Sequence, residues 1–381
     1  MPTKTKRSLE PIIFLVIFLG IFCLIGSKMG AANMLSTMMN TAYALLMDTV
    51  FYIMAIAVLA GAVSALLSEF GVVDLINKLV SPLMKPLFGL PGAASLGIIT
   101  TYLSDNPAIL ALANDGKFRG YFKKYQLPAL TNLGTAFGMG LIVTTFMIGI
   151  KSPTGENLVV AALIGNLGAF IGSIVSARLM LMQTKKIFGT EAMCDPLETV
   201  SGSEEQEKGK QGVGMRVIEC LMSGGKTGVQ LGLDIIPGVL IICTMVMMLT
   251  NGAPEGGFTG GAYEGVAFLP WLGDKITFIL KPLFGFTSAE CIAVPITALG
   301  AAGAAIGLVP GMISAGTATA HDIAVFTAMC MCWSGYLSTH VAMMDSLKHS
   351  NLTGKAILSH TIGGLCAGIA ANWIYQLISM L

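Results

Sequence analysis

The sequence predicts an all-α polytopic membrane protein built from two related halves, and three observations indicate this fold class. First, 54% of the 381 residues are apolar and only 11% are charged, whereas soluble domains carry roughly 25% charged residues. Second, several apolar stretches are long enough to cross a bilayer, which requires about 20 residues. Third, a motif recurs at a fixed offset, which indicates an internal duplication. The formal net charge of +1 gives no reason to expect a nucleic-acid partner.

The apolar stretches predict seven full-length spanning helices: Ile12–Gly30, Tyr43–Ser68, Leu127–Ile150, Leu158–Met182, Val229–Leu249, Ala320–Met344 and Ala356–Leu381. The first of them follows three basic residues, a pattern that a signal peptide would share. No small-residue cleavage site stands out, and the length of the run favours a retained spanning helix.

Two further apolar regions, Gly92–Ala113 and Ser288–Ser314, are interrupted near their centres by SDNP at Ser104–Pro107 and by LGAAGAA at Leu299–Ala305. Each half of such a region is too short to span. We therefore expect two re-entrant helical hairpins, which are tolerated only where protein or a water-filled cavity covers their backbone. An amphipathic stretch precedes each hairpin and predicts an interfacial helix, at Val72–Phe88 and Phe268–Phe284.

The pentapeptide KPLFG occurs at Lys85–Gly89 and again 196 residues later, at Lys281–Gly285. The same offset places Thr101 on Thr297 and Gly172 on Gly368. The predicted domains are residues 1–42 (a tail and the first helix), 43–183 (the first repeat, with its hairpin at 92–113), 184–226 (a cytoplasmic linker) and 227–381 (the second repeat, with its hairpin at 288–314). Within the linker, Ser201–Gly212 reads as mobile, and Val213–Ser223 as a short surface helix.

Each predicted half crosses the membrane three times, so the two repeats should be inverted relative to each other. With a cytoplasmic N-terminus, 18 of the 22 Lys and Arg residues lie on the cytoplasmic side, and the external ones are Lys28, Lys151, Lys275 and Lys281. The positive-inside rule favours this orientation. The sequence thus predicts a multi-pass protein of the cytoplasmic (inner) membrane, in contact with lipid.

KPLFG followed by SDNPAILAL, and KPLFG followed by TALGAAGAAIGL, resemble the GATE-domain family, also called nucleoside-recognition domain proteins. The order of elements is similar to that of concentrative nucleoside transporters. The resemblance implies an elevator-type secondary transporter of a small polar solute, assembled as a homo-oligomer. It leaves two alternatives: a structural or accessory membrane protein, as in sporulation-type GATE proteins, and a metal-ion permease.

Site residues follow position by position from the resemblance. At the first hairpin tip, Ser104, Asp105 and Asn106 stand where the nucleoside transporters have a Gln-Thr-Glu-Ala-Pro motif. The second tip, Gly300–Gly303, has no polar side chain where they have Asn-Glu-Phe. Trp333, Ser334 and Ser338 fall in the region of their Asn-Phe-Ser-Ser motif. Much sugar- and base-binding chemistry is missing, so the solute stays open between a nucleoside and an amino-acid-like or short-peptide-like zwitterion.

The residues themselves support the first hairpin tip. An acid at membrane depth is costly unless it is paired or faces water, so Asp105 is a candidate solute or proton site. The half-helix that starts at Pro107 offers free N–H groups, and the one that ends near Leu103 offers carbonyls for Na⁺. The alternative is that Asp105 or Asn106 simply caps a helix.

Thr131, Asn132 and Thr135 form a polar spot that could complete a cation site or join helices by hydrogen bonds. His340 could bind solute or relay protons, or it could be a packed histidine, and the same holds for His360. Thr287 and Glu290 match a capping box. Asp48 and Asp234 are interpreted as compensating helix dipoles.

We expect no enzyme activity, because no Walker A, HExxH or GxSxG motif occurs. We expect no bound metal and no cofactor beyond a coupling Na⁺ or H⁺. Cys330 and Cys332 point to nearly opposite sides of a helix and cannot converge on one ion.

Overall fold

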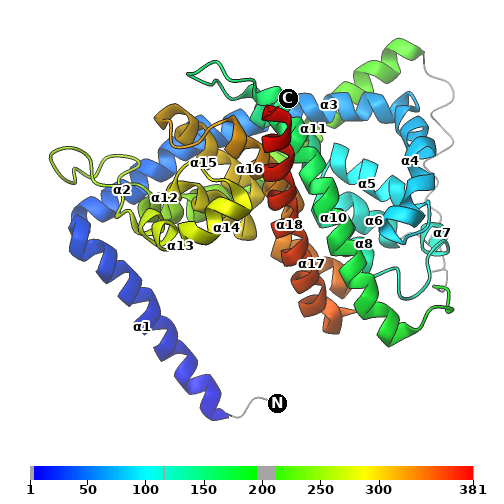
Figure 1. Cartoon of the computed structure of the whole chain (residues 1–381), viewed down its shortest axis with the longest axis horizontal. Helices are drawn as coiled ribbons and strands as arrows, with labels where there is room; N and C mark the ends of the chain where they lie inside the picture. Colours follow the sequence, from blue (N-terminus) through cyan, green and yellow to red (C-terminus); the bar gives the residue numbers. More distant parts are fainter. Residues whose placement is uncertain (1–3, 115, 195–211, 381) are drawn as a thin grey trace.

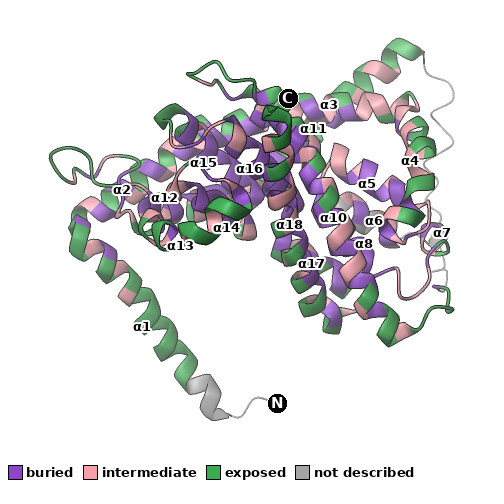
Figure 2. Cartoon of the chain, in the orientation of Figure 1, coloured by how far each residue is buried: buried purple, intermediate pink, exposed green. Residues whose placement is uncertain are grey.

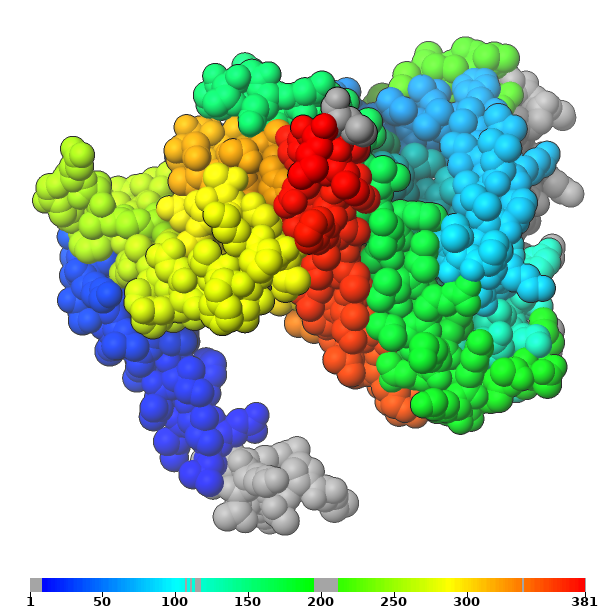
Figure 3. Space-filling view, viewed as in Figure 1, coloured from blue at the N-terminus to red at the C-terminus, as the bar shows by residue number. Residues whose placement is uncertain are grey.

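A computed structural model describes residues 4–114, 116–194 and 212–380, and the described chain is almost entirely helical. The all-α prediction is thereby confirmed. Helix α1 (Lys4–Met29) projects from the body of the molecule (Figures 1 and 3), and its apolar side chains are exposed along most of its length (Figure 2). Gly30, with a φ of 80°, separates α1 from α2 (Ala31–Ala44).

The two halves contain a similar order of helices, but α7 occurs only in the first half and the short helices η4 and η5 only in the second. The first half consists of α2, η1 (Leu45–Val50), α3 (Phe51–Glu69), α4 (Val72–Phe88), α5 (Ala94–Leu103), α6 (Pro107–Asn114), α7 (Gly116–Arg119), α8 (Ala129–Phe137), α9 (Gly140–Gly149) and α10 (Leu158–Phe188). The second consists of α11 (Val213–Gly238), η3 (Val239–Cys243), α12 (Thr244–Thr250), α13 (Phe268–Phe284), η4 (Ala289–Ile292), α14 (Ala293–Gly300), α15 (Ala302–Ala315), α16 (Ala320–Cys332), α17 (Tyr336–Ser346), η5 (Ser350–Leu352) and α18 (Thr353–Ser379).

Several backbone features recur at the KPLFG offset of 196 residues. Helices α4 and α13 begin and end at equivalent positions, and each ends at a left-handed glycine, with φ of 73° at Gly89 and 66° at Gly285. The breaks between α8 and α9 and between α16 and α17 also match. Met139 has a φ of 56° and Gly335 a φ of 61°. These matches extend the sequence repeat to the backbone.

The predicted interruptions of both hairpin regions are confirmed. Ser104–Asn106 separates α5 from α6, and Ala301 separates α14 from α15. In both cases the two short helices pack against each other. The Ile109 side chain fills the space above Gly97, which shows that the chain folds back at this point.

Six described helical runs are long and apolar enough to cross a membrane: Leu9–Met29, Ala31–Glu69, Ala129–Gly149, Leu158–Phe188, Val213–Thr250 and Ser350–Ser379. A seventh candidate, α13 with η4 and α14, is bent by 77°. The prediction of Ala320–Met344 as one continuous helix is wrong, because Trp333–Gly335 interrupts it. The Ala129–Gly149 run is likewise divided at Gly138 and Met139.

Val213–Ser223 is not a separate surface helix, because it forms the first turns of α11. Helix α11 packs along α3, where the backbone of Gly224 lies against Gly61 and that of Gly228 against Ala57. Most of the predicted mobile linker, residues 201–211, lies outside the described residues.

Helices α10 and α18 lie side by side through the middle of the molecule (Figure 1). A Cβ added to Gly172 of α10 would stand 2.4 Å from the carbonyl oxygen of Gly363 in α18. Small residues let helices approach closely where lipid supplies no hydrophobic driving force. This crossing joins the last helix of the first half to the last helix of the second half.

A loop of residues 251–267 follows α12 and is organised by Glu264. The carboxylate of Glu264 accepts hydrogen bonds from the Thr259 hydroxyl and from the backbone N–H groups of Thr259, Gly260 and Gly261. The loop is tied to α2, because Asn33 and Asn40 donate to its carbonyls. Burial raises the pKa of Glu264, but these hydrogen bonds outweigh burial and hold the pKa below its usual value of 4.5.

Gly172→Ala should destabilise the protein, because the new methyl group meets the Gly363 carbonyl. Overpacking costs about 1–3 kcal/mol, which would lower the melting temperature of the purified protein in detergent. Gly20→Ala is the matched control, since nothing lies within 4 Å of that position and alanine is the better helix former. Equal melting temperatures for the two variants would contradict the proposed close packing.

Glu264→Gln should loosen the loop at neutral pH, seen as faster deuterium exchange of the amides at 259–261. In the wild type, a lowered pKa means that the stabilisation is present above pH 4.5 and is lost as the pH falls through the folded-state pKa. Glu255→Gln, an exposed acid in the same loop, is the control and should leave exchange unchanged. Protection that persists in Glu264→Gln would refute the role of this carboxylate.

Candidate functional site

Four helix interruptions meet around one cavity of 300 Å³. The α5–α6 tip contributes Asp105 and Asn106, and the α14–α15 tip contributes Gly300–Ala304. The α8–α9 break contributes Met139, and the α16–α17 break contributes Ser334, Gly335 and, one turn on, Thr339. Helix α11 closes the remaining wall with Leu231, Asp234, Ile235 and Gly238. Both halves therefore contribute to a single site.

Asn106 lies at the crossing of two of these breaks. Its Oδ1 stands 2.0 Å from where a Cβ of Gly138 would be, and its Nδ2 stands 2.3 Å from where a Cβ of Gly335 would be. Only glycine at both positions leaves room for this amide. Asn106 is 7% exposed, and Nδ2 donates to Ser334 Oγ at 3.5 Å, while Oδ1 has no partner within the described part of the chain. A buried acceptor without a donor costs about 1–3 kcal/mol.

Two carboxylates face the same cavity, from Asp105 and from Asp234. Asp105 Oδ1 is buried and has no hydrogen-bond partner among the described residues. The two carboxylates interact electrostatically, and Asp234 Oδ1 accepts a hydrogen bond from Gln230 at 2.7 Å. Among the described residues that line the cavity there is no Lys, Arg or His. The cavity is therefore strongly acidic.

The interpretation of Asp234 as a helix-dipole residue is wrong. The helix begins at Val213, so Asp234 lies about six turns inside α11 and faces the cavity. Thr339 and Met139 were also missed by the sequence reasoning. The available signal for Asp234 was its acidic character within an otherwise apolar stretch.

The predicted solute residues separate into two groups. Asp105, Asn106 and Ser334 line the cavity. Ser104 does not line it, and its hydroxyl donates to the Thr100 carbonyl at 2.7 Å. Trp333 packs against Gly364, and its indole N–H donates to the His360 carbonyl at 3.3 Å. Ser338 belongs to α17, but its side chain lies outside the description.

His340 lies beside the cavity lining in a histidine pair with His360, and the two ring centroids are 4.8 Å apart. Carbonyls only accept, so His340 donates through Nδ1 to the Tyr336 carbonyl, and His360 donates through Nε2 to the Cys332 carbonyl. His360 Nδ1 then accepts from the Ser176 hydroxyl at 2.7 Å. Nε2 of His340 is buried and has no partner in the described ranges.

Thr131, Asn132 and Thr135 are all fully buried in α8, away from the cavity lining. Asn132 Nδ2 donates to Ser176 at 2.9 Å and to the Ala356 carbonyl at 3.0 Å, joining α8 to α10 and α18. Thr135 donates to the Thr131 carbonyl at 2.8 Å. Among the residues that the structure describes, Thr131 Oγ1 and Asn132 Oδ1 have no partner, and neither does Thr101 Oγ1 on the neighbouring helix α5. Thr101 was not among the predicted site residues.

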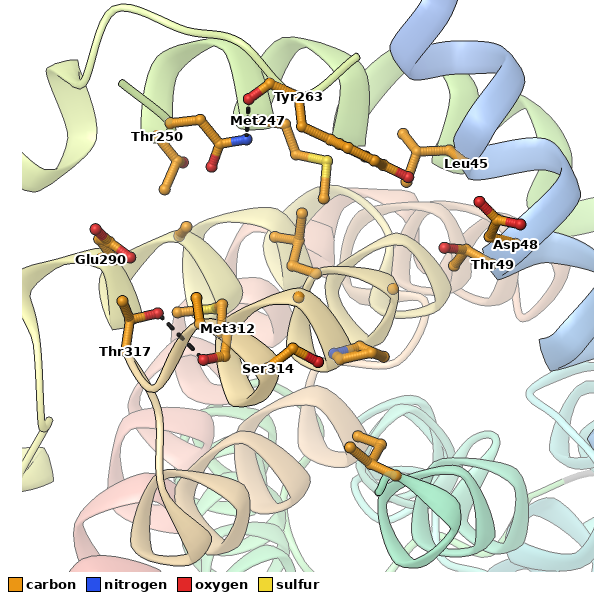
Figure 4. Close-up of a pocket in the computed structure, with 18 of the residues that line it drawn as sticks. Leu45, Asp48, Thr49, Met247, Thr250, Tyr263, Glu290, Met312, Ser314 and Thr317 are labelled. Atoms are coloured by element: carbon orange, nitrogen blue, oxygen red, sulfur yellow. Dashed lines mark hydrogen bonds between the residues drawn. The ribbon is translucent and has the colours of Figure 1, made fainter. Parts of the chain in front are cut away.

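A second cavity, of 620 Å³, lies between η1, α9, α12, α15 and the loop of residues 251–267. Asp48 and Glu290 lie at opposite ends of it (Figure 4). The capping-box prediction for Glu290 is wrong, because Thr287 bonds to Asp322, which forms its own capping box with Thr319. Helix α15 borders both cavities, with its first turn on the smaller and Gly307–Ala315 along the larger.

Paired cysteines can test the contact between the α5–α6 tip and the α16–α17 break. In a background without native cysteines, Asn106→Cys combined with Ser334→Cys should form a disulfide on mild oxidation, because these side chains touch. Ser104→Cys combined with Ser334→Cys should form far less, since Ser104 bonds away from the cavity. Equal cross-linking of both pairs, detected by mass spectrometry, would contradict the arrangement.

No family model matches the sequence, and neither does any curated protein. Among solved structures, the fold is similar to that of CNTnw, a concentrative nucleoside transporter, at low sequence identity. A doubly substituted CNTnw in an outward-facing state aligns with a TM-score of 0.55 and 16% identity, covering 88% of this chain and 80% of that one. CNTnw in an inward-facing, substrate-bound state aligns with a TM-score of 0.55 and 16% identity, covering 85% and 74%. An intermediate state aligns with a TM-score of 0.52 and 14% identity, covering 84% and 75%. This multi-pass helical protein therefore shares its fold with CNTnw over most of its length.

Proposed function

We propose that this protein is a secondary transporter of a small polar solute, and that the cavity at the four helix breaks is its solute site. The observation that carries the proposal is the convergence of four interruptions on Asp105, Asn106 and Ser334. Transporter sites are typically formed by discontinuous helices from two repeats. The shared fold with CNTnw supports the same conclusion.

In this proposal the two repeats are inverted, and the helical hairpins enter the membrane from opposite sides. The α5–α6 and α14–α15 pairs move with α8–α10 and α16–α18, carrying the solute in an elevator-type motion. Helices α3, α4, α11 and α13 form the scaffold, through which the protein assembles as a homo-oligomer. The distribution of Lys and Arg supports a cytoplasmic N-terminus in the inner membrane.

Two observations support ion coupling. Thr101, Thr131 and Asn132 each have an oxygen without a partner among the described residues, and they lie on two packed helices, so we propose them as ligands of a Na⁺ site. The unpaired Asp105 carboxylate is a candidate proton carrier. His340 lies next to the solute cavity but does not line it, so in this proposal His340 does not contact the solute directly.

The second candidate function is that of a structural or accessory membrane protein, and the exposed apolar surface of α1 is the observation that favours it. For the metal permease, the described residues contain no group of three His, Cys, Asp or Glu side chains that could hold an ion. The transporter and the accessory protein differ in whether the cavity residues matter.

Asp105→Asn should abolish solute uptake into proteoliposomes while leaving the melting temperature within a few degrees, because it removes only a charge. Asp274→Asn, an exposed acid on α13, is the matched control and should transport normally. Undiminished uptake by Asp105→Asn would reject the assignment of the cavity as the solute site.

Thr131→Val should raise the Na⁺ concentration that half-saturates uptake at least tenfold, because the substitution removes a hydroxyl oxygen while keeping the shape of the side chain. Thr327→Val is the control, because Thr327 is the equivalent residue of the second half and its hydroxyl already bonds the Ile323 carbonyl at 2.7 Å. Uptake driven equally with and without a Na⁺ gradient in the wild type would remove Na⁺ coupling.

A further inference from the structure

We propose that the solute carries a protonated amino group, and that Asp105 and Asp234 bind this group from two walls of the 300 Å³ cavity. This inference rests on the proposed function, because it names the class of solute for the same site. It selects the amino-acid-like or peptide-like alternative over the neutral nucleoside.

The charge of the cavity is the first argument. Asp105 and Asp234 are its only ionisable lining residues within the described chain, and they repel each other. A carboxylate withdrawn from water is costly unless a cation or several hydrogen bonds compensate it. This cost applies to Asp105, whose Oδ1 is buried without a partner among the described residues, whereas Asp234 is exposed. Since no described lining side chain supplies a cation, a cationic group on the solute would compensate the Asp105 carboxylate whenever it is not protonated.

The free acceptors are the second argument. A primary ammonium group has three donors and no acceptor. The cavity offers two buried acceptor atoms without a partner among the described residues, Asn106 Oδ1 and Asp105 Oδ1. The Asp234 carboxylate, which already accepts one hydrogen bond from Gln230, adds a third acceptor. The number and the kind of free groups match an ammonium.

The size and the remaining walls are the third argument. The 300 Å³ cavity is about ten times the ~30 Å³ share of one water molecule, too roomy for a bare ion. The other lining residues include Gly300–Ala304, Met139, Leu231 and Ile235. These walls offer backbone and apolar groups, which suit a small carbon body attached to the amine.

Asp234 comes from α11, and Asp105 from the α5–α6 tip, so the amine would bridge two parts of the molecule. This separates the role of Asp234 from that of a residue that merely stabilises its own helix. Replacing Asp234 should weaken amine binding while α11 keeps its packing against α3 through Gly224 and Gly228.

The experiment measures binding to the purified full-length protein in detergent by thermal shift and calorimetry. The probes are ethanolamine, glycinamide and histamine, compared with ethylene glycol, acetamide and uridine at constant ionic strength. A ligand that binds only the folded state raises the melting temperature. We expect shifts with the amines alone, and at least tenfold weaker amine binding in Asp234→Asn.

Asp274→Asn, with the same loss of charge outside the cavity, should bind amines like the wild type. Asp234→Glu keeps the charge and should keep the preference for amines, which guards against a folding defect in Asp234→Asn. Amine binding without uptake into proteoliposomes would support this inference and overturn the transport proposal. Binding or uptake of uridine in preference to every amine, or amine binding unaffected in Asp234→Asn, would overturn the inference and leave the transport proposal standing.

Discussion

The structure depends on a constraint on peptide groups inside a membrane. Every helix end leaves N–H or C=O groups without intrahelical partners, and each costs several kcal/mol in hydrocarbon. The chain ends helices at Ser104, Gly138, Ala301 and Trp333, in the middle of its apolar regions. By bringing all four ends to one cavity, the fold covers them with protein and gathers their polarity where a ligand can use it.

The sequence predicted two of the four interruptions and missed the other two. SDNP and the Gly-Ala run are recognisable breaks, and both are found in the structure. The breaks at Met139 and at Trp333–Gly335 lie in long apolar runs and contain one or two glycines each, and such glycines also occur inside continuous helices such as α10. The start of α11 was misjudged for a related reason. Its first turns contain charged residues and glycines that resemble a linker, and only the tertiary contact with α3 shows why they are helical.

The candidate site was partly predictable, because a buried acid or amide in an apolar stretch is conspicuous in any sequence. Asp105 and Asn106 were found in this way. The roles of Trp333 and His340 could not be separated from packing, because their partners come from other helices, such as His360 on α18. The same applies to the chain of hydrogen bonds from Asn132 through Ser176 and His360 to the Cys332 carbonyl. This chain of hydrogen bonds connects the candidate Na⁺ site to the α16–α17 break. Its Ser176–His360 step joins two residues that are 184 positions apart in the sequence.

Helix α15 is a thin wall between the two cavities, and its composition bears on how they could communicate. Its contacts with η1 and α11 run partly through residues with little or no side chain, although its large side chains, such as Ile306 and Val309, are buried in the core. A Cβ on Gly307 would meet Thr49, one on Gly303 would meet Ile235, and Gly238 faces Ala301. Such surfaces do not interlock as large side chains do, so they can separate without the rotamer changes that a packed core requires. Larger side chains here would fix α14 and α15 against η1 and α11. For the proposed carrier, the small residues at this wall therefore serve two needs: they admit the close approach that closes the solute cavity, and they let the same contact open toward the larger cavity.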